Sequence, residues 1–216
     1  EGLPDDIEFN PGGLAVVWAE ENSRTSIFSA LKRKEVYGTS GPRFLVRFFL
    51  GDELDENLCN RSDAISHAYE NGVPMGGTVK SNSMNKVKLF VSAPSDLSNN
   101  KQYIEKLQVI KGVVKNGEVE TSIHDIKTNE STELDLNTCE VVGIGVKSMC
   151  ALWEDKDFNK GDEAYYYVRV IANQSCRWSH DLCIKNPNYC QEDEDSSIPK
   201  FVQERAWTSP VWLENS

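Results

Sequence analysis

Six cysteines are the residues in this sequence whose type and number point most directly to chemistry. They are Cys59, Cys139, Cys150, Cys176, Cys183 and Cys190. An even number fits up to three disulfide bonds. Zinc is the competing interpretation, but zinc sites usually contain one closely spaced pair of cysteines, and the nearest cysteines here are seven residues apart. We therefore favour disulfides over zinc, and with them an oxidising compartment.

An acidic segment offers a second kind of chemistry. It places oxygen ligands on alternate residues, as calcium loops do, at Asp155, Asp157, Asn159 and then Asp162. An EF-hand would require glycine at the sixth position and glutamate at the twelfth, where this chain has Lys160 and Tyr166. A solvated turn between two strands is the favoured interpretation of the segment, and a calcium site outside the EF-hand class is the alternative.

Complete catalytic motifs are missing from the sequence. The three histidines, His67, His124 and His180, are scattered and form no HxH or HExxH pair, so each is expected to be an ordinary hydrogen-bonded histidine. The chain also contains no GxSxG elbow and no phosphate-binding P-loop. Three tryptophans suggest a carbohydrate platform, although packing in the core is the favoured role, and these are Trp178, Trp207 and Trp212.

The net charge, the hydropathy and the possible glycosylation sites indicate which partners and which location are expected. The formal net charge of −11 over 216 residues disfavours nucleic acid as a partner, because a phosphate backbone repels an acidic protein. No apolar run approaches the roughly 20 residues of a membrane helix. Three asparagines match the glycosylation pattern and support a secreted, extracellular or periplasmic location, namely Asn60, Asn129 and Asn173. The first residues lack a signal peptide, so we expect a processed chain.

The elements that position these residues are mostly strands. Residues 1–13 resemble a linker, and a short apolar strand at 14–18 follows. One amphipathic helix is expected at about 23–37, where residues 20–23 supply acidic residues and N-cap candidates including Ser23, and Gly38 follows the end. Alternating patterns, such as the one around Phe48, then predict about seven strands, including a hairpin around Asn116-Gly117. The prediction is an immunoglobulin-like antiparallel β-sandwich over 41–216, with long loops that carry the cysteines and residues 1–40 preceding it.

Several segments together resemble one protein family. They are GGLAVVWAEENSR at 12–24, YGTSGPR at 37–43, GVPMGG at 72–77, YYVRV at 166–170 and QERAWTSPVW at 203–212. In this order they resemble the C-terminal portion of a secreted or periplasmic domain-of-unknown-function family related to the PHP (polymerase and histidinol phosphatase) metallohydrolases. The resemblance spans nearly the whole chain and departs from the family in the cysteine-bearing loop at 173–200.

The resemblance implies that metal binding and completion of the fold belong to different regions of the family's proteins. In that family an upstream α/β barrel carries an HxH motif and a Ser-Asp-x-His-type element that bind divalent metals, and these motifs are absent here. It implies that the helix at 23–37 closes the barrel, which would be this chain's partner. The chain itself would then hold no cofactor except for the calcium considered above. If any of its residues reaches the cleft we expect Arg43, just after the turn that contains Ser40, because arginine can bind an anion by paired hydrogen bonds. A surface or structural role is the favoured alternative for Arg43.

Two functions remain open from the sequence. The first is a non-catalytic part of a PHP-like metal-dependent hydrolase, with a phosphoester as the expected substrate. The second is a stand-alone extracellular module that binds glycans or proteins, or builds an assembly, without enzymatic activity. Against the second function, the helix and the strand at 14–18 would expose an apolar face unless they pack on the sandwich or on a partner.

Overall fold

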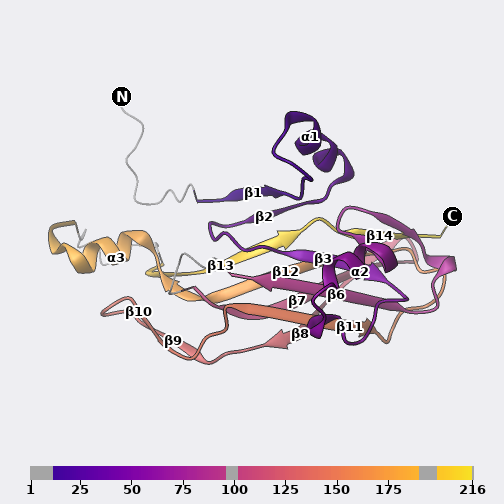
Figure 1. The fold of residues 1–216 in the computed structure, drawn as a ribbon. Coiled ribbons are helices and arrows are strands. Elements are labelled where there is room, and N and C mark those ends of the chain that lie inside the picture. The colour runs from indigo at the N-terminus through magenta and orange to yellow at the C-terminus, as the bar shows by residue number, and fades with distance from the viewer. Residues whose placement is uncertain (1–11, 96–101, 190–198, 216) are drawn as a thin grey trace.

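The fold was analysed in a computed structural model that describes residues 12–95, 102–189 and 199–215. It is mainly β, with a large eight-stranded sheet and a four-stranded sheet that enclose one core, and a separate two-stranded hairpin at one end (Figure 1). The predicted mainly β sandwich is therefore confirmed. The strands are more numerous than predicted because several pair over only two to four residues.

The larger sheet is organised around one long strand, β12 (Ala164–Cys176). One edge of β12 pairs with β7, which pairs in turn with β8, and the other edge pairs with both β13 and β14. Strands β2 and β1 extend the sheet beyond β13, and β5 lies parallel to β14. Their bounds are β1 (Leu14–Val17), β2 (Val36–Thr39), β5 (Thr78–Lys80), β7 (Ile104–Lys115), β8 (Glu118–Thr128), β13 (Phe201–Thr208) and β14 (Val211–Glu214).

The second sheet is antiparallel and runs in the order β11-β6-β3-β4. Its strands are β3 (Arg47–Gly51), β4 (Val73–Pro74), β6 (Val87–Pro94) and β11 (Ser148–Asp155), and the separate hairpin consists of β9 (Thr132–Asp135) and β10 (Glu140–Gly143). Alternate side chains of both sheets, such as Phe48 and Tyr166, are fully buried between them. This alternation is the period of two that a half-buried strand requires. A second cluster around Phe49 and Leu58 lies on the outer side of the smaller sheet.

The N-terminal helix is shorter than the sequence predicted. Helix α1 covers Arg24–Arg33 and begins at Ser23, whose hydroxyl accepts a hydrogen bond from the Ser26 N–H. The predicted end at residue 37, with Gly38 after it, is wrong. Lys34 adopts the left-handed conformation (φ 60°) and ends the helix, and the chain enters β2, where Tyr37 is buried in the core. Burial of this tyrosine in the sandwich outweighs its place in the helical pattern.

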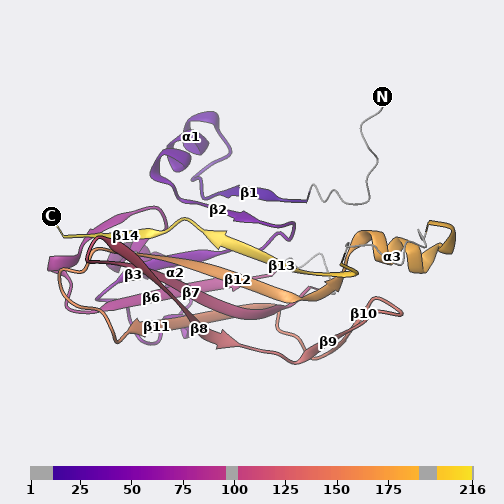
Figure 2. The same cartoon turned by 180° about the vertical axis from the view of Figure 1, so that it is seen from behind.

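Two segments predicted as loops contain further helices. Helix α2 (Ala64–Asn71) covers the outer cluster of the smaller sheet, and α3 (Trp178–Lys185) follows β12 at the end of the molecule near the β9–β10 hairpin (Figure 2). Short 3₁₀ turns occupy Leu58–Asn60, Ser81–Ser83 and Pro187–Tyr189. Both α-helices are eight residues long, too short for a clear helical period to stand out in the sequence.

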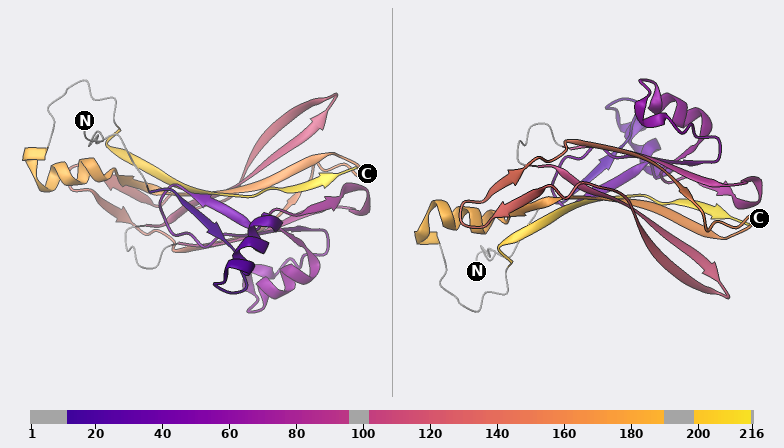
Figure 3. Two further views of the ribbon diagram at one scale, coloured as in Figure 1. Left: turned by 90° about the horizontal axis from the view of Figure 1, so that it is seen from above. Right: turned by 90° about the horizontal axis from the view of Figure 1, so that it is seen from below.

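The hairpin predicted at Asn116-Gly117 is confirmed. Both residues have positive φ values, 52° and 82°, as a two-residue type I′ turn requires. Strands β7 and β8 continue from this turn in unbroken register as far as Gln108. Their tip bends away from the smaller sheet and projects from the sandwich (Figure 3).

Candidate functional site

The most unusual surface of the molecule lies on α1 and β1. Phe28 and Leu31 are three residues apart and therefore point to the same side of the helix, and they are 66% and 50% exposed. Leu14 at the start of β1 is 38% exposed. We call Leu14, Phe28 and Leu31 the α1 face. An open groove of about 340 Å³ borders it, and its mainly apolar lining includes Val36 and Trp207.

The helix is not loosely attached, because a polar cluster below it ties it to the sandwich. Trp18 donates from its indole N–H to the Val46 carbonyl at 2.8 Å, and the Arg47 guanidinium lies 3.4 Å above the Trp18 ring. Glu35, which is 5% exposed, accepts a hydrogen bond from Tyr69 and lies 3.8 Å from Arg47. A guanidinium over an indole is a favourable cation–π contact. The chain on both sides of α1, at Trp18 and at Glu35, is thus anchored to the sandwich.

Sequence reasoning missed this polar cluster, because its members come from four separate segments of the chain. Burial, and next the hydrogen bond to Glu35, raise the pKa of Tyr69 to about 12. Tyr69 therefore stays neutral at physiological pH, donates to Glu35 and accepts from Arg47 at 2.7 Å. All these groups satisfy one another, which favours a structural role for the cluster over a catalytic one.

Ser40 and Arg43, the residues predicted to approach a cleft, differ in their surroundings. The Ser40 hydroxyl donates to the Glu204 carboxylate and accepts from the Arg205 N–H at 2.8 Å. This joins the chain after β2 to β13. Arg43 is exposed and makes no ion pair or hydrogen bond within the described residues. Ser40 is therefore committed to the fold, whereas the anion-binding role of Arg43 stays a prediction.

The acidic segment 155–162 does not bring its oxygen atoms together around one point. Asp155 is buried and accepts from Lys111 Nζ and from Tyr166 Oη, each at 2.6 Å, so it faces the interior. Asp162 instead accepts from the Asn159 N–H at 3.0 Å. Burial raises the pKa of the Asp155 carboxyl, but hydrogen bonds from Lys111 and Tyr166 outweigh it and hold this pKa below its ordinary value.

This arrangement bears directly on calcium. A cation at Asp155 would have to displace the Lys111 ammonium, which already compensates the charge of the carboxylate. The Asp157 side chain is exposed and takes no part in the hydrogen bonds described for this turn, which use only its backbone N–H and carbonyl. Within the described residues its carboxylate does not join those of Asp155 and Asp162 in a group that could hold a metal ion. The geometry fits a buried ion pair at the end of β11 better than a calcium loop, and calcium binding here stays a prediction.

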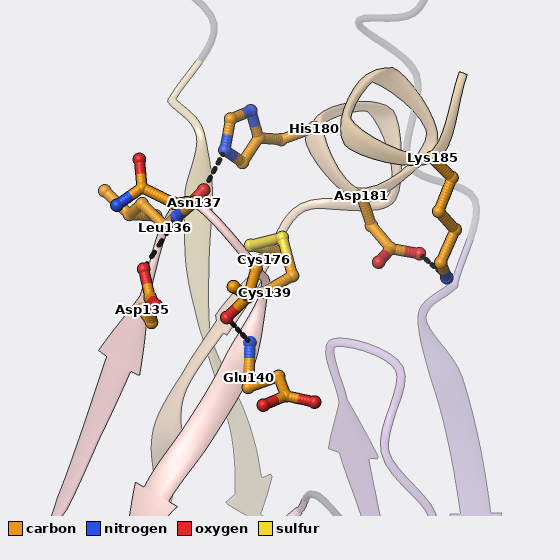
Figure 4. The surroundings of a disulfide bond; sticks show 10 residues. Asp135, Leu136, Asn137, Cys139, Glu140, Cys176, His180, Asp181 and Lys185 are labelled. Atoms are coloured by element: carbon orange, nitrogen blue, oxygen red, sulfur yellow. Dashed lines mark hydrogen bonds and ion pairs between the residues drawn. A yellow bond between two sulfur atoms is a disulfide. The ribbon is translucent and has the colours of Figure 1, made fainter. Parts of the chain in front are cut away.

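The cysteines form disulfides, as the sequence predicted. Cys59 is bonded to Cys150 and Cys139 to Cys176, and Cys183 is also disulfide-bonded. The prediction for Cys190 falls outside the described residues. Two described disulfides fit a protein of an oxidising compartment. The first joins the 3₁₀ turn after β3 to β11, and the second joins the β9–β10 hairpin to the end of β12 (Figure 4).

The three histidines lie on separate elements. His67 on α2 is near the Asn71 side chain, and His124 on β8 packs against Trp153. His180 on α3 lies close to the Cys139–Cys176 disulfide, and its Nε2 is 2.9 Å from the Leu136 carbonyl oxygen (Figure 4). No two of them form a pair that could hold the divalent metals of a hydrolase within the described residues.

The three predicted glycosylation sites differ in how exposed their asparagines are. Asn60 is exposed, whereas Asn129 is half-buried and its side-chain nitrogen, the atom that a glycan would be attached to, is buried. Asn173 is only 3% exposed, and its amide bonds the Tyr103 N–H and the Gln174 carbonyl. A glycan at Asn173 would have to displace both bonds.

The tryptophans expected in the core are on the surface instead. Trp178, Trp207 and Trp212 are 47%, 37% and 39% exposed, so the core-packing prediction is wrong. In β13 and β14 the neighbouring small or aliphatic residues point inward, which turns the tryptophans outward. Trp212 packs against Tyr165 with ring centroids 5.5 Å apart, and Tyr165 stacks beside Tyr167 at 6.4 Å.

The fold and the site define a disulfide-bonded, mainly β protein with an uncovered apolar face. No helix among the described residues has the length and apolar character to cross a membrane. The chain matches the family described as "Protein of unknown function (DUF3604)" over residues 3–215, and it belongs to this family. No curated protein and no solved structure matched the chain.

Proposed function

We propose that this chain is the C-terminal, non-catalytic part of a PHP-like metal-dependent hydrolase acting on phosphoesters, and that its α1 face packs on an upstream barrel. The exposed state of Phe28 and Leu31, on a helix whose flanking residues are anchored to the sandwich, carries this proposal. Burial of apolar surface is worth about 25 cal/mol per Å². An apolar face beside an apolar groove is therefore suited to a packing partner.

The metals of such an enzyme would be held by the upstream barrel. The described histidines and carboxylates do not form the multi-histidine metal centre that such a hydrolase requires, because His67, His124 and His180 lie on three different elements and Asp155 is paired with Lys111. The contribution of this chain is to complete the fold and shape one wall of the cleft. Arg43, exposed and unpaired within the described residues, would bind the anionic group of the substrate by paired hydrogen bonds.

A second candidate is a stand-alone extracellular binding or assembly module. The outward-facing row of Trp212, Tyr165 and Tyr167 favours it, since exposed aromatic rings with polar neighbours are typical of binding surfaces. Both candidates place the protein outside the cytoplasm, secreted, extracellular or periplasmic, which the disulfides support. The two candidates differ in whether the α1 face is covered by another part of the same polypeptide.

The coding sequence upstream of Glu1 and one activity assay test the first candidate. We expect the gene to encode an upstream region with HxH and Ser-Asp-x-His-type motifs. The full gene product should hydrolyse p-nitrophenyl phosphate in the presence of Mn²⁺, whereas the 216-residue chain should not. Arg43→Ala in the full product should raise KM more than it lowers kcat, because it removes a substrate-binding contact. A gene without such a region, or hydrolysis by the chain alone, would rule out this proposal and favour the binding module.

A further inference from the structure

One disulfide of the molecule has a histidine beside it. Cys139 follows β9, Cys176 ends β12, and His180 lies in the first turns of α3. The sulfur atoms and one imidazole nitrogen all lie within 4.8 Å of one another (Figure 4). Cys176 and His180 are only four residues apart, and the β9–β10 hairpin brings Cys139, 37 residues before Cys176, to the same point. Within the described residues this is the only such group of histidine, cysteine or carboxylate side chains.

These three side chains have the ligand chemistry of zinc. Thiolate sulfur and imidazole nitrogen bind Zn²⁺ at about 2.3 Å and about 2.0–2.1 Å, and three protein ligands with a water in the fourth position form a common zinc site. In the disulfide the sulfurs carry no charge and bind metals poorly. We propose that reduction of the Cys139–Cys176 disulfide converts this cluster into a Zn²⁺ site made of Cys139, Cys176 and His180.

The conversion is balanced when a phosphine supplies the two electrons. The phosphine attacks one sulfur, the S–S bond breaks, and water hydrolyses the resulting adduct to give two thiols and a phosphine oxide. Zn²⁺ then binds both thiolates, and two protons are released. The imidazole, which faces the Leu136 carbonyl oxygen at 2.9 Å, must give up this hydrogen bond and turn its nitrogen to the metal.

The surroundings favour retention of this geometry after reduction. Cys139 is only 7% exposed and lies between β9 and β10, and β9 packs against β12. Both cysteines therefore stay close when the covalent bond is broken. The bound metal would keep the β9–β10 hairpin, β12 and α3 joined, so that one cross-link replaces another. Disulfide and zinc, which compete as interpretations of the sequence, are in this account two states of the same residues.

The Cys59–Cys150 disulfide provides an internal control. It has similar Cα separation, 5.6 Å compared with 5.5 Å, but among the residues that the structure describes no histidine or carboxylate joins it in a ligand cluster. A dithiol alone offers two ligands, fewer than the three or four that zinc sites use. The two pairs therefore predict different metal affinities after the same reduction.

The test is a Co²⁺ titration of the whole chain after reduction with tris(2-carboxyethyl)phosphine, followed by competition with Zn²⁺. We expect one Co²⁺ per chain with a thiolate charge-transfer band that Zn²⁺ abolishes. His180→Ala should weaken binding roughly tenfold or more, and Cys139→Ser should abolish the band. The Cys59→Ser/Cys150→Ser double variant and Cys183→Ser should retain it.

Circular dichroism of the reduced chain is measured alongside, so that loss of the site is not confused with loss of the fold. The proposal is wrong if the reduced chain is folded but gives no cobalt band, or if reduction unfolds it and metal does not restore the fold. Equal affinity of the wild type and His180→Ala would also contradict it. In that case the band would report a dithiol without the histidine.

Discussion

The interior of the sandwich and the α1 face treat their side chains in opposite ways. Inside, even charged groups are paired: Lys111 and Asp155 lie 2.6 Å apart with side chains only 6% and 1% exposed, and Tyr166 completes the group. On the α1 face, two large apolar side chains meet solvent although the chain on both sides of the helix is anchored to the sandwich. This interior pair is thus satisfied within the sandwich, whereas the α1 face leaves apolar surface exposed to solvent, as binding surfaces do.

Among the mutations that test this difference, breaking the buried ion pair should lower the free energy of unfolding the most. Asp155→Asn leaves the Lys111 ammonium buried without a compensating charge, and breaking a buried pair in this way costs about 3–5 kcal/mol. Urea unfolding would measure the loss. The control is Asp157→Asn, two residues away and exposed, which should change the free energy of unfolding by no more than about 0.5 kcal/mol.

The same carboxylate predicts a pH dependence. Its pKa in the folded protein lies below the ordinary value, as argued above, so its contribution is fully present above the unfolded pKa of about 4. It is lost as the pH falls through the lower folded pKa. Unfolding free energies measured between neutral and acid pH should fall less steeply below about pH 4 in Asp155→Asn than in the wild type. Parallel curves would show that Asp155 does not carry this dependence.

The two disulfides should differ in the stability that they provide. In the loop-entropy account the gain grows with the length of the closed loop, and the sequence separations are 91 for Cys59–Cys150 and 37 for Cys139–Cys176. Cys150 also packs against the second buried cluster. Cys59→Ser/Cys150→Ser should cost about 2–5 kcal/mol, and the Cys139→Ser/Cys176→Ser variant less. Thermal unfolding of the oxidised proteins would show this order, and the reverse order would contradict it.

The start of α1 should make a smaller contribution. Ser23→Ala removes the side-chain acceptor for the Ser26 N–H, 3.2 Å away, which costs about 1 kcal/mol. Ser23→Asp supplies a different acceptor and should largely retain the stability. Urea midpoints of the two variants would separate capping from a general effect of substitution at this position.

The α1 face itself should give the smallest effect on stability. Phe28→Ser with Leu31→Ser replaces side chains that are 66% and 50% exposed, and we expect a change within about 1 kcal/mol in the isolated chain. The variant should also aggregate less at high concentration, because the exposed apolar surface is smaller. Lys32→Ser, on the same helix and exposed, is the matched control. A loss as large as that of Asp155→Asn would mean that these residues belong to the core.

Local sequence patterns predicted much of this fold. The features that they did not predict depend on contacts between residues that are distant in sequence. The Asn116-Gly117 hairpin, the Ser23 cap and the alternation around Phe48 follow from turn chemistry and periodicity, which act between near neighbours. The end of α1 did not follow, because burial of Tyr37 in the distant core competes with the helical pattern. Trp212 was predicted in the core because tryptophan is large and apolar. Residue type alone does not tell which face of a strand points to the core, and Trp212 lies on the outer face of β14.

The candidate site was less accessible to sequence reasoning than the fold. The disulfides could be predicted from the number of cysteines, but their pairing brings together residues up to 91 positions apart, which no spacing rule specifies. Asp155 matches a calcium loop in sequence, yet its partner Lys111 comes from another sheet. Arg47 and Trp18 carry no local signal for their contact at all, since it depends on how β1 and β3 are placed by the core.

Hydrogen–deuterium exchange of α1 and β1, compared between the 216-residue chain and the full gene product, tests the central claim most directly. If the α1 face is an interface within a larger enzyme, amide protection in α1 and β1 should rise several-fold in the full product, and Phe28→Ser/Leu31→Ser should reverse the rise. Amides of β12, already buried in the sandwich, should exchange alike in both. Equal exchange of α1 and β1 in the two proteins would contradict the claim and leave the stand-alone binding module as the better account.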